Sequence, residues 1–197
     1  MIFRLLRRLA SLAPPRVGNW TTSIRIARPR SLSNPQLIRF GRDVVARTGL
    51  IISPITRHGQ TQYTPRVEIG DGCYLGRYCF LSCIDHILIG RNVVLSDYVY
   101  ITDVTHGMTP GAGHILEQPL LSKGPVVIGD DCFLGYGVRV MPGVTLGRNC
   151  IVATSAVVTR SFPNFTMVAG IPAQPVKRFD PTTATWLPFE ADAGLFS

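Results

Sequence analysis

The chain has 197 residues, of which 46% are apolar and 16% charged, with 19 glycines and 15 prolines. This composition excludes a disordered chain and fits one globular domain with a sizeable core, with or without a small extension. Five cysteines form no Cys-x-x-Cys pair and follow no recognisable secretory signal, so we expect reduced core residues rather than disulfides or a zinc site. They are Cys73, Cys79, Cys83, Cys132 and Cys150.

The formal net charge of +8 is concentrated at the amino end of the chain. Residues 1–48 hold ten arginines and one acidic residue, Asp43, whereas the remainder holds ten basic and eleven acidic residues. Charge therefore does not mark the main body as a nucleic-acid binder, and we expect no nucleic-acid partner.

The first fifteen residues, MIFRLLRRLASLAPP, interleave apolar residues with arginines and end in two prolines that stop a helix. The segment is too short and too charged to span a bilayer, and its apolar run is shorter than a secretory signal needs. We expect residues 1–20 to form a basic amphipathic segment, with a short helix that lies on an anionic membrane surface. A short helix packed on the domain, or a frayed terminus, is the alternative.

An apolar residue recurs every six positions through most of the remaining chain. The pattern is clearest in residues 126–158, where a small residue usually follows each apolar position. The same phase recurs in two upstream triplets, and a weaker triplet precedes them. The apolar positions are Phe40, Ala46, Ile52, Ile69, Leu75, Leu81, Ile89, Leu95, Ile101, Ile128, Leu134, Val140, Leu146, Val152 and Val158.

A period of six fits neither a helix nor a flat two-sided sheet. It predicts a short strand and a tight turn, repeated, with one apolar residue per side pointing inward and a small residue easing each corner. Three sides close a triangular coil, and stacked coils bury a continuous core. Five candidate coils follow, at 40–52, 69–81, 89–101, 128–140 and 146–158.

The spacing breaks only between triplets, with eleven extra residues after position 52, two after 81 and twenty-one after 101. Every insertion is therefore expected to leave from the same corner of a triangular prism. The insertions carry all four histidines of the chain, which are His58, His86, His106 and His114. Because loops on a rigid scaffold often carry function, we expect a site along this edge.

Two segments resemble a known family: the loop ITDVTHGM, and the stretch VIGDDCFLGYGVRVMPGVTLGRNCIVATSAVVTRSFPNFTMVAGIPAQPVKR. Both are similar to the left-handed β-helix (hexapeptide-repeat) acyltransferases, chiefly the maltose and galactoside O-acetyltransferases and the sugar O-acetyltransferases of exopolysaccharide and lipopolysaccharide clusters. The resemblance covers residues 67–178. It implies an all-β fold, a left-handed parallel β-helix of four to five coils at 21–178, with a long loop at 102–125 and a C-terminal tail at 179–197.

The resemblance further implies a homotrimer with active sites between subunits, acetyl-CoA as the acyl donor and no metal. In the family a histidine of the long loop acts as general base, and His106 falls at that position. A neutral imidazole can take the proton of a sugar hydroxyl while its oxygen attacks the thioester, so no covalent intermediate is needed. The resemblance assigns the donor for the tetrahedral intermediate to the amide of Tyr136. Asp103 orients His106 or binds substrate, or else is a solvated loop carboxylate.

The resemblance also implies which residues contact coenzyme A. Arg160 and Lys177 stand where the family has basic residues, which suit the phosphates of CoA. Three positions depart from the family, because Tyr136 and Thr154 replace small residues and Gln174 replaces a frequent basic one. The full expected set is Phe133, Tyr136, Thr154, Thr159, Arg160, Gln174 and Lys177.

On the acceptor side, Ser82 stands where sugar acetyltransferases of this kind often have asparagine, and Asp85 and His86 occupy the two-residue insertion. We expect these three residues to bind substrate; the alternative is that they are ordinary corner residues. The expected acceptor is a sugar hydroxyl in surface polysaccharide biosynthesis, and a lipid-linked oligosaccharide would suit the basic amino end. This implies a cytoplasmic enzyme, peripheral on the inner face of the membrane.

Three other functions remain open from sequence. A zinc enzyme of the γ-carbonic anhydrase kind would need three histidines that converge on zinc across a trimer interface, and His86, His106 and His114 are the candidates because they share an edge. A non-catalytic trimeric scaffold would need neither a histidine loop nor a basic groove. The same chemistry can also serve another small acceptor, such as serine, a nucleotide amino sugar or an antibiotic, because fold does not select among them.

Overall fold

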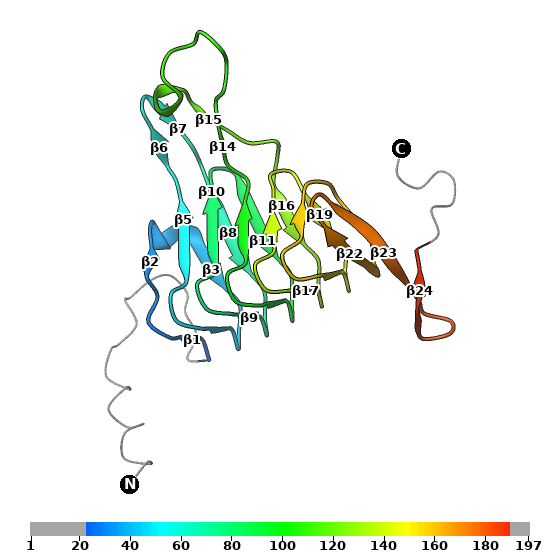
Figure 1. Ribbon diagram of the computed structural model, residues 1–197. Coiled ribbons are helices and arrows are strands. Elements are labelled where there is room, and N and C mark those ends of the chain that lie inside the picture. The colour runs from blue at the N-terminus through cyan, green and yellow to red at the C-terminus, as the bar shows by residue number, and fades with distance from the viewer. Residues whose placement is uncertain (1–22, 190–197) are drawn as a thin grey trace.

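The computed structural model describes residues 23–189, so the expected basic segment at 1–20 lies outside the described residues. The described chain winds repeatedly through three sheets that form the faces of a prism (Figure 1). No helix within 23–189 is long and apolar enough to cross a membrane. Each face is a stack of short strands, one from each successive turn, and the strands within the coils run parallel.

The strands of the prism lie on three faces, each a stack of strands along its length. The first face contains β1 (Arg25–Ile26), β4 (Val45–Ala46), β9 (Tyr74–Leu75), β12 (Val94–Leu95), β17 (Phe133–Leu134), β20 (Ile151–Val152), β22 (Thr166–Gly170), β23 (Ala173–Asp180) and β24 (Thr185–Pro188). The second face contains β2 (Ser31–Leu32), β5 (Ile51–Pro54), β10 (Phe80–Cys83), β13 (Tyr100–Thr102), β18 (Arg139–Val140) and β21 (Val157–Val158). The third face contains β3 (Ile38–Phe40), β8 (Arg66–Ile69), β11 (His86–Ile89), β16 (Val126–Ile128) and β19 (Thr145–Leu146).

Inward residues of successive turns stack on one another, as the period of six predicts. On the second face Leu81 is in register with Ile52 and Ile101, and the column continues to Val140 and Val158. All five side chains are fully buried. Burial of one large aliphatic side chain contributes about 1.5–3 kcal/mol, so these columns hold the prism together. The five predicted coils are confirmed.

The prism begins one turn earlier than the sequence analysis recognised. Ile26 and Leu32 continue the phase of the repeat, in strands that pair with β4 and β5. Both side chains are partly buried and pack against the core. The pattern was missed because this turn shows only two repeat positions before a two-residue break, in a stretch rich in arginine.

The corners between the third and first faces explain the small residues of the repeat. A Cβ added to Gly129 would lie 2.6 Å from the backbone nitrogen of Arg148 in the next turn, closer than such atoms approach. Here Asp130 also ties two turns together, because its carboxylate accepts hydrogen bonds from the backbone and guanidinium of Arg91, both at 2.7 Å. The same arrangement recurs at another corner. Glycine and aspartate thus let the turns approach closely.

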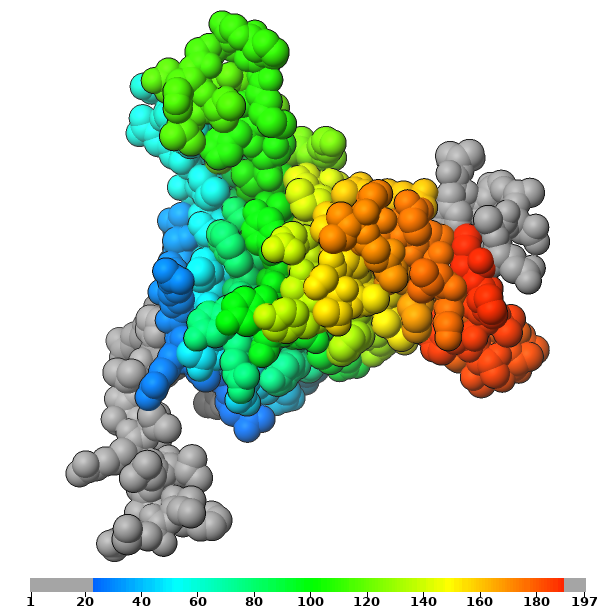
Figure 2. All heavy atoms as spheres, viewed as in Figure 1, coloured from blue at the N-terminus to red at the C-terminus, as the bar shows by residue number. Residues whose placement is uncertain are grey.

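All three insertions leave the prism at the corner between the second and third faces, as predicted. One connects β5 to β8, one connects β10 to β11, and the longest connects β13 to β16. The first and third project from the same edge of the prism (Figures 1 and 2). They contain β6 (Arg57–His58), β7 (Thr61–Gln62), β14 (Thr105–His106), the 3-10 helix η3 (Ile115–Glu117) and β15 (Leu120–Leu121). A further 3-10 helix, η2 (Pro35–Leu37), occupies this corner in the first turn.

The carboxyl end closes the prism with antiparallel strands. β22 pairs with β23, and β23 pairs with β24. The ring of Phe179 lies 5.9 Å from Phe165 and 5.4 Å from Trp186, measured between ring centroids. The segment expected as a tail from residue 179 therefore begins inside β23, and its described part up to residue 189 includes the strand β24.

The five cysteines are all buried, as expected for core residues. Burial raises the pKa of Cys73 to about 11 and the pKa of Cys79 to about 12. Since only the thiolate is a strong nucleophile, these thiols contribute packing rather than reactivity.

Candidate active site

The long insertion that carries His106 is a built structure held by its own side chains. β14 and β15 pair antiparallel, so that His106 is in register with Leu120. The buried amide of Gln118 clamps the far end of the loop, since its nitrogen donates to the carbonyls of Thr109 and Gly113 and its oxygen accepts from the Thr109 amide. Sequence reasoning missed Gln118, which lies outside the repeat and shows no pattern of its own.

The imidazole of His106 is partly buried and lies beside a second histidine. Its Nδ1 is buried, and among the described residues it has no hydrogen-bond partner; the same holds for Nε2 of His58. The two ring centroids are 5.6 Å apart in an edge-to-face arrangement. His58 comes from the first insertion, so two insertions contribute to the surroundings of the expected base.

The first insertion is fixed against the long loop by Tyr63. Its hydroxyl accepts a hydrogen bond from the Leu120 amide at 2.8 Å and donates to the Leu120 carbonyl at 3.1 Å. Leu120 is the register partner of His106. Tyr63 therefore sets the position of the strand next to the histidine. A contact between residues 57 apart in sequence had no signal in the repeat pattern.

Asp103 does not have the solvated position offered as its alternative, because its side chain is completely buried. One carboxylate oxygen accepts from the Ile84 amide at 2.8 Å, and the other accepts from the Asp85 amide at 2.9 Å and from the Cys83 thiol at 3.3 Å. Both oxygens are thus used to fix the corner between β10 and β11. Burial and the neighbouring Asp103 raise the pKa of Cys83, so this thiol stays protonated.

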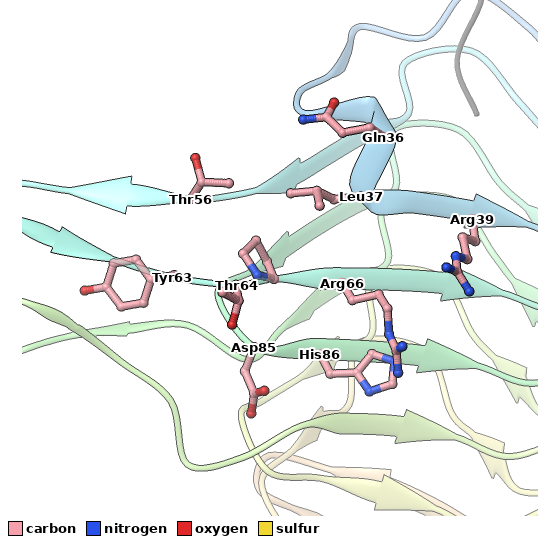
Figure 3. A pocket seen from close by; sticks show the side chains of 10 residues that line it. Gln36, Leu37, Arg39, Thr56, Tyr63, Thr64, Arg66, Asp85 and His86 are labelled. Atoms are coloured by element: carbon pink, nitrogen blue, oxygen red, sulfur yellow. The ribbon is translucent and has the colours of Figure 1, made fainter.

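The expected acceptor residues lie on the same edge. Ser82 is nearly buried in β10, between Ser53 and Thr102 in register. Asp85 and His86 line a cavity of about 530 Å³ on the outer face of the third sheet (Figure 3). The structure therefore brings these two residues together at one surface, whereas Ser82 is largely covered by its neighbours.

The residues expected to contact CoA lie elsewhere on the prism. Tyr136 and Thr154 are exposed at the corner between the first and second faces, and Phe133 is exposed on the first face. The Tyr136 ring lies 5.4 Å from Tyr98, which stacks at 5.1 Å on Tyr78. An exposed aromatic row therefore follows this corner.

The remaining expected CoA residues gather near the carboxyl end. Thr159 and Arg160 follow β21, while Gln174 and Lys177 lie in β23, and all four are exposed. A guanidinium nitrogen of Arg160 donates a hydrogen bond to the side-chain carbonyl of Gln174. This contact gives a physical reason for glutamine at position 174, because a second cation there would repel Arg160.

The histidines of the zinc alternative form no metal-binding group within the described part of a single chain. His114 is exposed, and its Nδ1 accepts a hydrogen bond from the Leu116 amide. Among residues 23–189 no group of three or more His, Cys, Asp or Glu side chains is arranged to hold a metal ion.

A prism of six-residue repeats with a histidine loop on one edge defines an acyltransferase of the hexapeptide class, and comparison with known proteins agrees. The family model described as "Bacterial transferase hexapeptide (six repeats)" matches residues 125–160. The putative lipopolysaccharide biosynthesis O-acetyl transferase WbbJ of Escherichia coli K12 is 30% identical over 164 residues, which is 80% of each chain. The chain belongs to the hexapeptide-repeat acetyltransferase family.

Two further similarities extend this result. The putative colanic acid biosynthesis acetyltransferase WcaF of E. coli K12 is 28% identical over 135 residues, 68% of this chain and 66% of that protein. The crystal structure of AntD, an N-acyltransferase from Bacillus cereus in complex with dTDP and 3-hydroxybutyryl-CoA, superposes with a TM-score of 0.63 at 16% identity, over 83% of this chain and 80% of AntD. At that identity the likeness concerns the fold alone. The expected left-handed β-helix and the acyltransferase class are confirmed, which leaves the scaffold alternative without support.

Proposed function

We propose that this protein transfers an acetyl group from acetyl-CoA to a sugar hydroxyl during surface polysaccharide biosynthesis. The names of the relatives WbbJ and WcaF support this acceptor class. The single observation that carries the proposal is the position of His106, which the antiparallel pairing and the Tyr63 contact hold at the edge from which every insertion emerges.

In the proposed reaction His106 acts as general base through Nε2, because its Nδ1 is buried. The neutral imidazole takes the proton of the sugar hydroxyl while the oxygen attacks the thioester carbonyl. The tetrahedral intermediate then collapses, the carbon–sulfur bond breaks, and the imidazolium of His106 returns its proton to the CoA thiolate. This sequence needs no covalent enzyme intermediate.

A backbone amide at the corner between the first and second faces suits the oxyanion. The equivalent amide of Arg77 is occupied by the carboxylate of Asp97 in the next turn, at 2.7 Å. In the turn after Tyr136 the matching residue is Thr154, and within residues 23–189 no hydrogen bond from the Tyr136 amide is found. This free donor supports the assignment of Tyr136 to the oxyanion.

Within one chain His106 and Tyr136 lie on different edges of the prism. We therefore propose a homotrimer in which the loop of one subunit meets the CoA groove of its neighbour. In that groove Phe133, Thr154 and the exposed polar residues of the carboxyl end would hold the donor, with Arg160 and Lys177 near the CoA phosphates.

We further propose that residues 1–20, which lie outside the described residues, bring the enzyme to the inner face of the cytoplasmic membrane, where a lipid-linked oligosaccharide would be the acceptor. Deletion of residues 1–15 is expected to reduce sedimentation with anionic liposomes. Unchanged sedimentation would remove this part of the proposal.

The main test is transfer of labelled acetyl from acetyl-CoA to a panel of sugars and lipid-linked oligosaccharides, with serine and a nucleotide amino sugar as rival acceptors. His106→Ala is expected to lower kcat about 10²–10⁴-fold. His114→Ala, an exposed histidine of the same loop, is the matched control and should leave kcat unchanged. Full activity of His106→Ala, or preference for a rival acceptor, would overturn the assignment.

A further inference from the structure

The cavity beside His86 is formed by two structural layers. Its floor is the outer face of the third sheet, where β3, β8 and β11 lie side by side, and one wall comes from the first insertion. The volume of about 530 Å³ falls within the range of small-molecule sites, which is about 300–1,000 Å³. The lining residues are Gln36, Leu37, Arg39, Thr56, Tyr63, Thr64, Pro65, Arg66, Asp85 and His86 (Figure 3).

One end of this cavity is cationic. Arg66 Nε lies 2.7 Å from Glu68 Oε1, and His86 Nε2 lies 3.2 Å from the same oxygen without hydrogen-bond geometry. Arg39 stands opposite Glu68 on the neighbouring strand. Its side chain is exposed, and in the described part of the chain no acidic group forms an ion pair with it. Arg66 is therefore paired with Glu68, whereas Arg39 has no acidic partner among the described residues.

The other end of the cavity offers groups that suit sugar hydroxyls. The carboxylate of Asp85 and the hydroxyls of Thr56 and Thr64 lie on the side away from Arg39 (Figure 3). Carboxylate oxygens accept hydrogen bonds, and threonine hydroxyls both donate and accept them. The cavity thus separates a cationic end from a carboxylate and hydroxyl end.

The cavity also adjoins the loop of the proposed base. Tyr63 lines the cavity, and its hydroxyl is bonded to Leu120, the register partner of His106. A ligand in the cavity therefore contacts the residue that positions the strand beside His106.

We propose that this cavity binds the acceptor as a sugar phosphate, with the phosphate at Arg39 and Arg66 and the sugar ring at Asp85. The inference deepens the proposed function and rests on it for the role of the ligand as acceptor. Arginine suits a phosphate because its planar guanidinium donates two parallel hydrogen bonds to phosphate oxygens. A neutral sugar would provide no anionic partner for the guanidinium of Arg39.

The test is calorimetric titration of the full-length protein with glucose 1-phosphate, glucose and inorganic phosphate. Glucose 1-phosphate is expected to bind at least about tenfold more tightly than either of the other probes. Arg39→Ala is expected to weaken glucose 1-phosphate about tenfold, whereas Arg57→Ala, an exposed arginine of the first insertion outside the cavity, should not. Circular dichroism confirms that each variant is folded.

A second variant separates the two ends of the cavity. Asp85→Asn is expected to weaken glucose 1-phosphate and leave inorganic phosphate unchanged. The phosphate assignment would be overturned if glucose and glucose 1-phosphate bound equally tightly. It would also be overturned if Arg39→Ala and Arg57→Ala lost the same affinity for glucose 1-phosphate. Equal binding of inorganic phosphate and glucose 1-phosphate would overturn the sugar assignment. Because titration needs no turnover, these outcomes are independent of the acetyl-transfer test.

Discussion

The prism and its insertion edge are built on opposite principles. In the prism each inward position is filled by the same kind of residue, and successive turns bury a continuous apolar column. At the insertion edge each contact is made once, by polar side chains such as Tyr63, Asp103 and Gln118. The difference indicates that the repeat supplies stability, and the breaks in it supply the chemistry.

The largest effect should come from filling a corner of the prism. Gly129→Ala places a methyl group 2.6 Å from the Arg148 backbone, so the free energy of unfolding should fall by about 3 kcal/mol. Gly59→Ala in the first insertion meets no atom within 4 Å and should cost only about 1 kcal/mol, for its left-handed backbone. Denaturant unfolding of both variants measures the difference, and equal losses would break the comparison.

A second effect should appear in catalysis without a change in the prism. His58→Gln removes the ring that lies edge-to-face beside His106 and should lower kcat about tenfold, with an unaltered KM for acetyl-CoA. The control is His114→Gln on the exposed part of the long loop. An unchanged kcat in His58→Gln would contradict a role of His58 in positioning His106.

A smaller effect is expected from loosening the contact between the two insertions. Tyr63→Phe removes both hydrogen bonds to Leu120 and should reduce local stability by about 1 kcal/mol. Hydrogen exchange at the Leu120 amide should then accelerate, while amides of the inward columns keep their protection. Tyr74→Phe, an exposed tyrosine on the first face, is the control. Faster exchange throughout the prism would contradict the separation of the two regions.

The smallest effect concerns pH and the prism alone. Burial raises the pKa of Cys79 from 9.0 to about 12, so above the lower value the unfolded state loses a proton that the folded state keeps. The contribution of Cys79 to the free energy of unfolding is therefore complete below the pKa of the unfolded state. This contribution declines as the pH rises towards the pKa of the folded state. When the pH is raised from about 8 to about 9.5, the free energy of unfolding should fall by about 0.8 kcal/mol more in the wild-type protein than in Cys79→Ala, as measured by denaturant unfolding at each pH. If the free energies of unfolding of the wild type and of Cys79→Ala changed equally with pH, the prediction would be wrong.

The sequence predicted the prism well, whereas it missed most of the contacts at the insertion edge. The six-residue period placed Leu81, Ile101 and their equivalents in the core, and its breaks placed all insertions at one corner, because both follow from local spacing. The roles of Asp103 and Tyr63 depended on hydrogen bonds to backbone groups distant in sequence. The burial of Asp103 in particular was not foreseen, since a carboxylate next to a loop is usually exposed.

The residues expected to contact CoA remain predictions, because they came from the resemblance and lie away from His106. For Gln174 the structure adds a partner that sequence did not suggest, namely Arg160. The cavity around Arg39 was likewise invisible, since it joins the first turn to an insertion and to the corner near His86.

The single exit corner also bears on how such an enzyme changes its substrate. Each turn is complete on its second face before an insertion begins, and the next strand resumes in register on the third face. Lengthening a connection that already spans this gap adds little free energy, because the entropy of loop closure grows only slowly with length. A new acceptor can thus be accommodated by exchanging one insertion, while the stacked turns of the prism stay the same.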